Sequence, residues 1–320
     1  MPLWVGAEPF CEYASIGEAV EELERRDPQI PETLYILSGT YREQLRIYRS
    51  NLKMIGVGQV TIEMNRFARE KGTDGKEIGT FATPTLFLGG SDLRVENITV
   101  SNTAGQGESI GQAIAVAAYC DRTVFRSCIF KGHQDTLFTG PLPPSPKKGS
   151  VFGGIEIRQR HEQYRQLYMN CRIEGTVDYV FGGACAYFEQ CELHSLARPN
   201  QDSFGYVTAA STPENQSFGY VFRRCVLTAA SDVASASVYL GRPWRAYART
   251  VFADCRMGSH IHPEGWDNWG DAANERTADY REYGSAAGKD SSRRVAWAVN
   301  DTSPGKLWSR GDVFADERFW

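Results

Sequence analysis

The sequence predicts an all-β fold built as a solenoid of stacked coils. A six-residue pattern, apolar-x-polar-Cys-x-apolar, recurs along the chain, and alternation of this kind is typical of strands. Successive copies of its cysteine are separated by 43, 20, 34 and 30 residues, as expected when loops of different length leave successive coils. Patterns for long helices are nearly absent. The five copies carry Cys128, Cys171, Cys191, Cys225 and Cys255.

These five cysteines are predicted to form a ladder inside the coils. Equivalent positions of neighbouring coils lie about 4.8 Å apart along a solenoid axis, and a free thiol packs as a small hydrophobe. The chain has eight cysteines and no C-x-x-C pair, which disfavours a zinc ribbon or a thioredoxin-like site. Residues 95–100 fit the same frame with Ile98 in place of cysteine.

One amphipathic helix is predicted near the start of the chain. Ser15 and Glu18 have the spacing of a capping box, and an apolar stripe follows at helical spacing. Asp27 and Pro28 end the helix, which would cover the open end of the solenoid. The stripe consists of Ile16, Ala19, Val20 and Leu23. Strands are then predicted over residues 33–37, 45–48, 52–55, 60–63 and 86–88.

Two stretches interrupt the repeat. Residues 139–163 begin with a run rich in proline and glycine, which predicts a long loop inserted in one coil. Residues 267–294 have few apolar positions and are predicted to be irregular, as part of a C-terminal wrapping segment, 267–320. Since no linker separates two cores, the whole chain 1–320 is predicted to form one domain.

The composition disfavours several classes of partner. The chain has 35 Lys and Arg against 39 Asp and Glu, a formal net charge of −4, so it offers no basic face for nucleic acid. No apolar run is long enough to span a bilayer. The first residues lack the basic segment and apolar core of a signal peptide. We therefore expect a cytoplasmic protein or, alternatively, a secreted one whose leader has been removed.

Four segments carry unusual polar residues beside predicted strands. Gln112 and Gln134 are 22 residues apart, about one coil, and Asp135 and Asp178 are 43 apart, about one coil once the inserted loop is removed. Stacking would bring the two carboxyl groups together, so that one pKa rises and the pair divides into acid and base or nucleophile. Arg242 is the candidate that holds the other carboxylate ionised. The segments are residues 111–116, 132–137, 175–182 and 240–244.

Each of these residues also has a purely structural interpretation. Taken alone, Asp135 and Asp178 would be buried aspartates that cap turns at strand ends. Arg242 alone would be a surface ion pair, and Trp244 alone would be a packing residue. Only their common register favours catalysis.

The polar segments closely resemble the motifs of the pectin methylesterases, the pectinesterase family of carbohydrate esterases. The resemblance extends from the predicted helix to residues 294–297 and covers nearly the whole chain. It implies a right-handed parallel β-helix, in agreement with the repeat. The matching motifs are residues 39–43 (GTYRE), 112–113 (QA), 134–137 (QDTL), 175–182 (GTVDYVFG) and 240–244 (LGRPW).

The resemblance also implies a role for each polar residue. Asp178 would be the nucleophile and Asp135 the general acid and then base. Gln112 and Gln134 would donate hydrogen bonds to the developing oxyanion, and Arg242 would pair with Asp178. The reaction would be hydrolysis of galacturonate methyl esters with release of methanol, through an acyl-enzyme and without a cofactor or metal.

Substrate contacts are implied at three aromatic positions. Trp244 would pack against the sugar, because a flat apolar ring suits the C–H face of a pyranose. Tyr179 and Trp269 are further substrate-binding candidates. The expected partner is methyl-esterified homogalacturonan or its oligomers, and short oligomers if the protein is cytoplasmic. No nucleic acid or membrane partner is expected. The chain is expected to be a monomer.

Two alternatives remain open at the level of the sequence, and two further classes are disfavoured. A polygalacturonase or pectate lyase is disfavoured, since the clusters of acids that those chemistries need are not evident. A serine esterase is disfavoured because no G-x-S-x-G segment occurs. A β-helix esterase or thioesterase acting on another ester, or a non-catalytic carbohydrate-binding solenoid, would show the same repeat.

Overall fold

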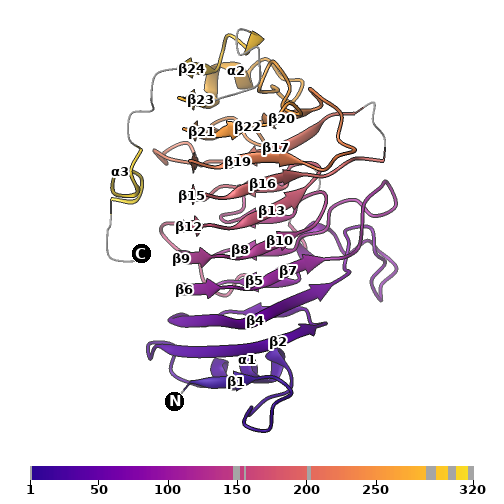
Figure 1. The fold of residues 1–320 in the computed structure, drawn as a ribbon, viewed down its shortest axis with the longest axis vertical. Coiled ribbons are helices and arrows are strands. Elements are labelled where there is room, and N and C mark those ends of the chain that lie inside the picture. Colours follow the sequence, from indigo (N-terminus) through magenta and orange to yellow (C-terminus); the bar gives the residue numbers. More distant parts are fainter. Residues whose placement is uncertain are drawn as a thin grey trace.

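The chain folds as a parallel β-helix whose coils stack along one axis from the N-terminal to the C-terminal end (Figure 1). The computed structural model describes residues 2–146, 152–154, 156–199, 203–285, 293–301 and 308–315. In these residues the strands form a 17-stranded and a seven-stranded sheet, and neighbouring strands run parallel throughout both. The prediction of an all-β solenoid is therefore confirmed.

The 17-stranded sheet bends once in each coil, so that it covers two sides of the helix. Its first side contains β1 (Leu3–Val5), β2 (Glu32–Tyr41), β4 (Leu52–Met64), β6 (Ser91–Glu96), β9 (Asp121–Arg126), β12 (Arg165–Met169), β15 (Cys185–Glu189), β18 (Tyr220–Arg223), β21 (Arg249–Ala253), β23 (Asp279–Tyr283) and β24 (Val299–Asp301). Its second side contains the ends of β2 and β4 together with β7 (Thr99–Asn102), β10 (Ile129–Lys131), β13 (Arg172–Gly175), β16 (Glu192–Ser195), β19 (Val226–Ala229) and β22 (Arg256–Met257).

The seven-stranded sheet forms the third side of the helix. It consists of β3 (Leu45–Ile47), β5 (Leu86–Leu88), β8 (Val116–Ala118), β11 (Leu137–Thr139), β14 (Val180–Gly182), β17 (Gly205–Ala210) and β20 (Val238–Gly241). A short 3-10 helix, η1 (Thr80–Ala82), precedes β5. This third side carries the polar motifs.

A single backbone feature explains the cysteine repeat. The residue directly before each ladder position lies in the left-handed region, with φ between 52° and 55°, and this conformation turns the chain sharply between the two sides of the large sheet. The following residue then points inward. The six turn residues are Asn97, Ser127, Asn170, Gln190, Arg224 and Asp254.

The interior is a set of columns that run along the axis. The five ladder cysteines are buried and unpaired, which confirms the predicted ladder. Beside them an aromatic column stacks face to face, with centroids 4.4 Å apart between Tyr168 and Phe188 and again between Phe188 and Phe222. A buried residue of this kind contributes both apolar burial and ring contacts, so the columns hold successive coils in register.

Helix α1 (Ile16–Arg25) covers the N-terminal end of the β-helix, as predicted (Figure 1). The Ser15 hydroxyl accepts a hydrogen bond from the backbone N–H of Glu18 at 3.2 Å, and the predicted apolar stripe is buried. The strands predicted over 52–55 and 60–63 are one long strand, β4. The two other helices are α2 (Asn274–Thr277) and α3 (Arg310–Phe314).

The prediction of irregular structure over residues 267–294 is wrong in part, because β23 pairs with β21 and adds another rung to the helix. Among the described residues of this stretch, only Tyr280 supplies a large, fully buried apolar side chain. The inward carboxylate of Glu282 is compensated by Arg294, whose Nε lies 2.8 Å from Oε1, and by Trp266 Nε1 at 3.2 Å. Residues 286–292 lie outside the described part.

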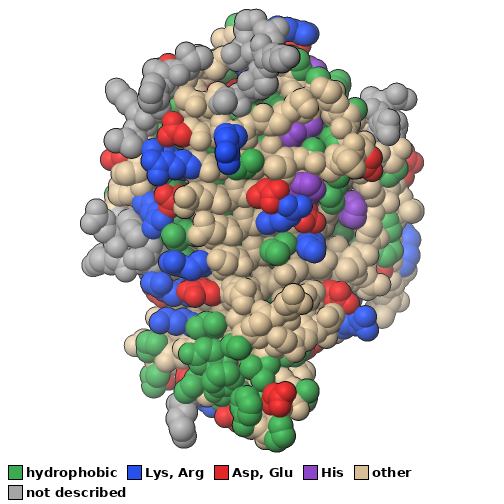
Figure 2. All heavy atoms as spheres, in the orientation of Figure 1, with side chains coloured by type: hydrophobic (Ala, Val, Ile, Leu, Met, Phe, Trp, Pro, Cys, Tyr) green, Lys and Arg blue, Asp and Glu red, His purple; other side chains and the backbone are tan. Residues whose placement is uncertain are grey.

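The surface mixes charges of both signs. On the face shown in Figure 2, acidic and basic side chains alternate, and apolar side chains gather at the N-terminal end of the helix. Among the described residues, no helix is both long and apolar enough to cross a membrane.

Candidate active site

The polar motifs come together because they belong to adjacent rungs of the seven-stranded sheet. Strand β11 pairs with β8 on one side and with β14 on the other. The backbone N–H of Asp135 donates to the carbonyl of Val177 at 3.0 Å, and Ala113 N–H donates to the carbonyl of Gln134 at 3.1 Å. The predicted stacking of Gln112, Gln134, Asp135 and Asp178 on neighbouring coils is therefore confirmed.

Both aspartates have an unusual backbone conformation. Asp135 has φ 64° and Asp178 has φ 50°, the left-handed region that aspartate and asparagine enter more readily than most residues. Each lies two residues before its strand, so the backbone turns there and directs the carboxyl group toward a shared cavity. Their side chains are largely buried, with 8% and 6% of each residue exposed.

Arg242 fixes the position of the Asp178 carboxylate. Its Nε and Nη2 donate to Oδ1 and Oδ2 at 2.9 and 2.7 Å, a bidentate pair that fixes orientation as well as charge. The guanidinium lies between two rings, 3.9 Å from the Tyr206 centroid and 3.8 Å from that of Trp269. Both partners are therefore held by contacts outside the pair.

The two carboxyl groups have different electrostatic environments. Burial raises the pKa of Asp135 well above its usual range, and the nearby Asp178 carboxylate raises it further against the opposing effect of Arg242. Asp178 is ion-paired, whereas Asp135 is favoured in its protonated form. The arrangement thus offers an oriented carboxylate beside a carboxylic acid that can donate a proton.

Gln112 and Gln134 complete the polar side of the cavity. Neither side-chain amide has a hydrogen-bond partner within the described ranges, and both residues are partly exposed. Two amide groups with free N–H donors can stabilise negative charge that develops on an oxygen between them and Asp178.

The rest of the cavity lining is largely aromatic. The cavity has a volume of about 520 Å³, and sugar units fit clefts of this size class. Its aromatic lining comes from Phe81 of η1, Phe152 of the inserted loop, Phe181 of β14, Trp244 and Trp269. A ligand here would contact both polar groups and aromatic rings.

The predicted substrate-binding residues have different positions. Trp244 lines the cavity, with the Arg245 guanidinium 4.8 Å from its ring centroid. Trp269 also lines the cavity, and it stacks on Arg242 in addition. Tyr179 does not fit the prediction, because its side chain is fully buried and its hydroxyl lies 3.2 Å from Ser195 Oγ. The left-handed turn at Asp178, with φ 50°, directs the following side chain into the coil.

Sequence reasoning missed several lining residues. Phe181 lies three residues after Asp178 within a recognised motif, so the motif itself was the available signal. Tyr206 lies on β17 and stacks on Arg242. Phe81 and Phe152 come from irregular segments without periodicity, and the sequence gives no signal for them.

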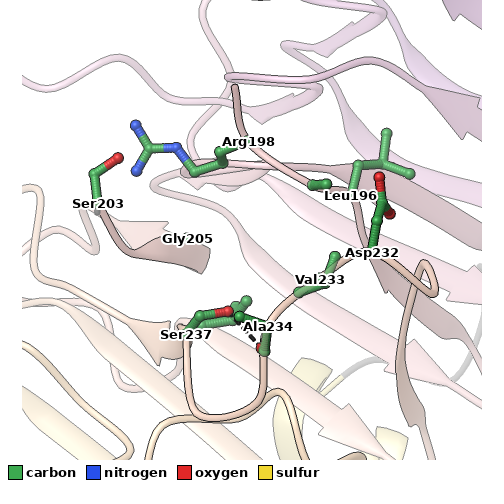
Figure 3. A pocket seen from close by; sticks show the side chains of 10 residues that line it. Leu196, Arg198, Ser203, Gly205, Asp232, Val233, Ala234 and Ser237 are labelled. Carbon is green, nitrogen blue, oxygen red and sulfur yellow. Dashed lines mark hydrogen bonds between the residues drawn. The ribbon is translucent and has the colours of Figure 1, made fainter. Parts of the chain in front are cut away.

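Other hollows of the described chain do not reach these carboxylates. Beside β17, Figure 3 shows a pocket in which the Arg198 side chain extends toward Ser203 and away from Asp232. Its volume of about 30 Å³ has room for about two water molecules. A cavity of about 640 Å³ lies between the end of the inserted loop and α3. Among the described residues there is no group of three or more His, Cys, Asp or Glu side chains that could hold a metal ion.

Comparison with known sequences adds independent information. The family model described as pectinesterase matches residues 3–156 and 160–306. Pectinesterase 31 of Arabidopsis thaliana is 37% identical over 239 residues, which are 74% of this chain and 64% of that protein. Probable pectinesterase A of Neosartorya fischeri is 33% identical over 294 residues, 88% of this chain and 78% of that protein. The match to this chain covers 64% of the length of Arabidopsis pectinesterase 31 and 47% of the length of Citrus sinensis pectinesterase 2.

Two solved structures share the architecture. The deglycosylated pectin methylesterase from Aspergillus niger has a TM-score of 0.78 and 29% identity, and the match covers 99% of this chain and 94% of that chain. The pectin methylesterase from carrot also has a TM-score of 0.78 and 29% identity, with 95% of this chain and 89% of that chain covered.

Proposed function

The chain belongs to the pectinesterase family, and from this premise we propose that it hydrolyses the methyl esters of galacturonate units and releases methanol. The observation that carries the proposal is a buried Asp135, whose pKa is raised by burial and by Asp178, beside an Asp178 carboxylate held by Arg242. This pair lines a cavity together with two side-chain amides and several aromatic rings.

In the first step Asp178 is the nucleophile. One carboxylate oxygen attacks the carbonyl carbon of the methyl ester and forms a tetrahedral intermediate. Arg242 keeps the attacking group ionised and oriented, so that no proton has to be removed from it first. The side-chain amides of Gln112 and Gln134 donate hydrogen bonds to the negative oxygen.

In the second step the tetrahedral intermediate collapses and the bond to the methoxy oxygen breaks. Asp135 gives its proton to that oxygen, so the leaving group departs as methanol rather than methoxide. An acyl-enzyme remains, in which Asp178 and the galacturonate carboxyl share one oxygen.

In the third step water resolves the acyl-enzyme. Asp135, now ionised, takes a proton from water, and the resulting hydroxide attacks the galacturonate carbonyl carbon. Collapse releases the Asp178 carboxylate and a free galacturonic acid, and Asp135 is protonated again. The net change consumes one water and one methyl ester and produces methanol and one carboxylic acid.

The substrate is proposed to be methyl-esterified homogalacturonan or its oligomers. The aromatic lining supports a carbohydrate, since rings stack on the C–H faces of sugars. Short oligomers would be preferred if the protein works in the cytoplasm, and the compartment stays a prediction that cell fractionation would test.

The test compares three substrates with the purified chain. Methyl-esterified oligogalacturonides should release methanol without any change in chain length, as measured by methanol oxidation and mass spectrometry. An acyl thioester should not be hydrolysed, and de-esterified oligogalacturonides should not be shortened. Chain shortening without methanol, or turnover of the thioester alone, would contradict the proposal.

A further inference from the structure

The inserted loop forms one wall of the cavity along the helix axis. Its first part reaches the rung of β20, where Arg245 Nη2 donates to the carbonyl of Ser145 at 2.7 Å. Its later part passes the rungs of β5 and β3, where His161 Nε2 lies 3.1 Å from the carbonyl oxygen of Gly89. There the Arg158 guanidinium also lies 3.9 Å from the Tyr48 centroid. The loop is thus attached to the helix both before and after Phe152 in the chain.

Phe152 is the side chain that this loop presents to the cavity. Its ring packs edge-on against Phe81 at 5.5 Å and against Trp244 at 6.4 Å. Directly beside it, Gly154 lies so close to η1 that an added Cβ would be 2.4 Å from the backbone nitrogen of Ala82. The close approach at Gly154 therefore fixes how far Phe152 reaches into the cavity.

The ring cluster lines the same cavity as both carboxyl groups. Phe81 packs against Phe138 at 5.0 Å and against Phe181 at 6.3 Å, and these two rings lie three residues after Asp135 and Asp178. Phe152 extends this apolar surface from Phe81. In the proposed reaction Asp135 protonates the methoxy oxygen inside this cavity, where the methyl group can reach the rings of Phe81 and Phe152.

We propose that Phe152, supplied by the inserted loop, is a specificity-determining residue that forms with Phe81 an apolar subsite for the methyl group of the scissile ester. This inference rests on the proposed function and adds to it the group that selects the alkyl part of the ester. An apolar wall stabilises a methyl group and does nothing for a free carboxylate. In this proposal the same pair of rings also limits the space for a longer alkyl group.

The test measures kcat/KM for matched methyl and ethyl esters of an oligogalacturonide. Phe152→Ala should lower the value for the methyl ester about tenfold, the scale of one lost apolar contact in a specificity pocket. The same substitution should lower kcat/KM for the ethyl ester much less. The ratio of kcat/KM for the methyl ester to that for the ethyl ester should therefore fall at least about fivefold. Inhibition by the de-esterified oligomer should stay within about twofold of wild type.

A second variant reaches the same subsite without removing the ring. Gly154→Ala should push the loop away from η1 and lower the methyl-to-ethyl ratio in the same direction as Phe152→Ala. Its matched control is Gly105→Ala, since Gly105 also has positive φ, 84° against 93°, but an added Cβ there meets nothing within 4 Å. Phe10→Ala, at a residue 61% exposed, is the control for loss of a phenyl ring.

The outcomes separate the two proposals. A reduced ratio in both variants with wild-type ratios in both controls supports the subsite. An unchanged ratio in Phe152→Ala, even with lower activity on both esters, would overturn it while methanol release by the wild type leaves the proposed function intact. Absence of methanol release by the wild type would overturn the proposed function, and this inference with it.

Discussion

Replacing Arg242 with methionine isolates the group that orients the proposed nucleophile. Methionine keeps much of the side-chain length, and it removes both hydrogen bonds to Asp178, at 2.9 and 2.7 Å. The carboxylate would then be buried without its ion-pair partner, next to the carboxyl group of Asp135. A proton shared between the two groups would neutralise the nucleophile at neutral pH.

The expected loss of activity follows from those two bonds. A hydrogen bond to a charged group contributes about 1.5–3 kcal/mol, so two contribute about 3–6 kcal/mol. At about 1.4 kcal/mol per tenfold change, kcat/KM should fall by about 10²- to 10⁴-fold. Arg242→Lys keeps the charge but not the bidentate geometry, and it should recover about half of the lost free energy.

The assay is methanol release from a methyl-esterified oligogalacturonide, with near-ultraviolet circular dichroism to verify the fold. Arg256→Met, at an exposed arginine of β22, is the control for a lost charge and should keep wild-type activity. A folded Arg242→Met variant within tenfold of wild-type kcat/KM would refute the assignment of Arg242 as the residue that orients Asp178.

Further predictions concern charge, thiols and packing. Because burial raises the pKa of Asp135, the folded chain loses stability as the pH rises from about 3.9, the unfolded value, through the raised folded value. Asp135→Asn should therefore unfold at higher urea than wild type at pH 8 and at the same urea concentration at pH 3, and it should be nearly inactive. Lower stability than wild type at pH 8 would contradict the raised pKa of Asp135. A thiol reagent should label only Cys11 in the native protein and all eight cysteines in denaturant; rapid native labelling of more than one would contradict the buried ladder. Phe188 lies between two rings, each 4.4 Å away, so Phe188→Ala should lower the free energy of unfolding by about 3–5 kcal/mol in a urea titration. The control Phe10→Ala, at an exposed residue, should lower it by less than about 0.5 kcal/mol. Equal effects of the two substitutions would contradict the aromatic column.

The coil repeat was predictable because each coil contains the same short sequence pattern at the same turn. A polar residue that tolerates a left-handed turn precedes a small apolar residue that must fit inside, as at Asn170 and Cys171. The spacing of such pairs gives the length of each coil, and from it the stacking of Asp135 on Asp178. This stacking needs no long-range information beyond the size of the inserted loop.

Segments without periodicity were not predictable in the same way. The loop that carries Phe152 is rich in proline and glycine, and its path depends on single contacts such as Arg245 with Ser145. Strand β23 was missed because its interior side combines Tyr280 with a charged residue, Glu282, whose partner Arg294 lies in a later segment. Pairing over that distance leaves no pattern in the sequence.

The orientation of Tyr179 shows a limit of reasoning from motifs. The motif places this residue beside Asp178, which suggests contact with the same ligand. The left-handed turn at Asp178 directs the next side chain inward, as at the ladder cysteines, and the ring is fully buried. Position relative to the turn therefore predicts exposure better than proximity in the motif.

The central claim is that Asp178 performs the chemistry with Asp135 as its acid. Methanol release by Asp178→Asn tests it most directly, because asparagine also tolerates the left-handed backbone at φ 50° and keeps the shape of the site. We predict a folded protein whose kcat/KM for a methyl-esterified oligogalacturonide is at least about 10³-fold below wild type. A folded Asp178→Asn variant that releases methanol at a rate near that of the wild type would contradict the account.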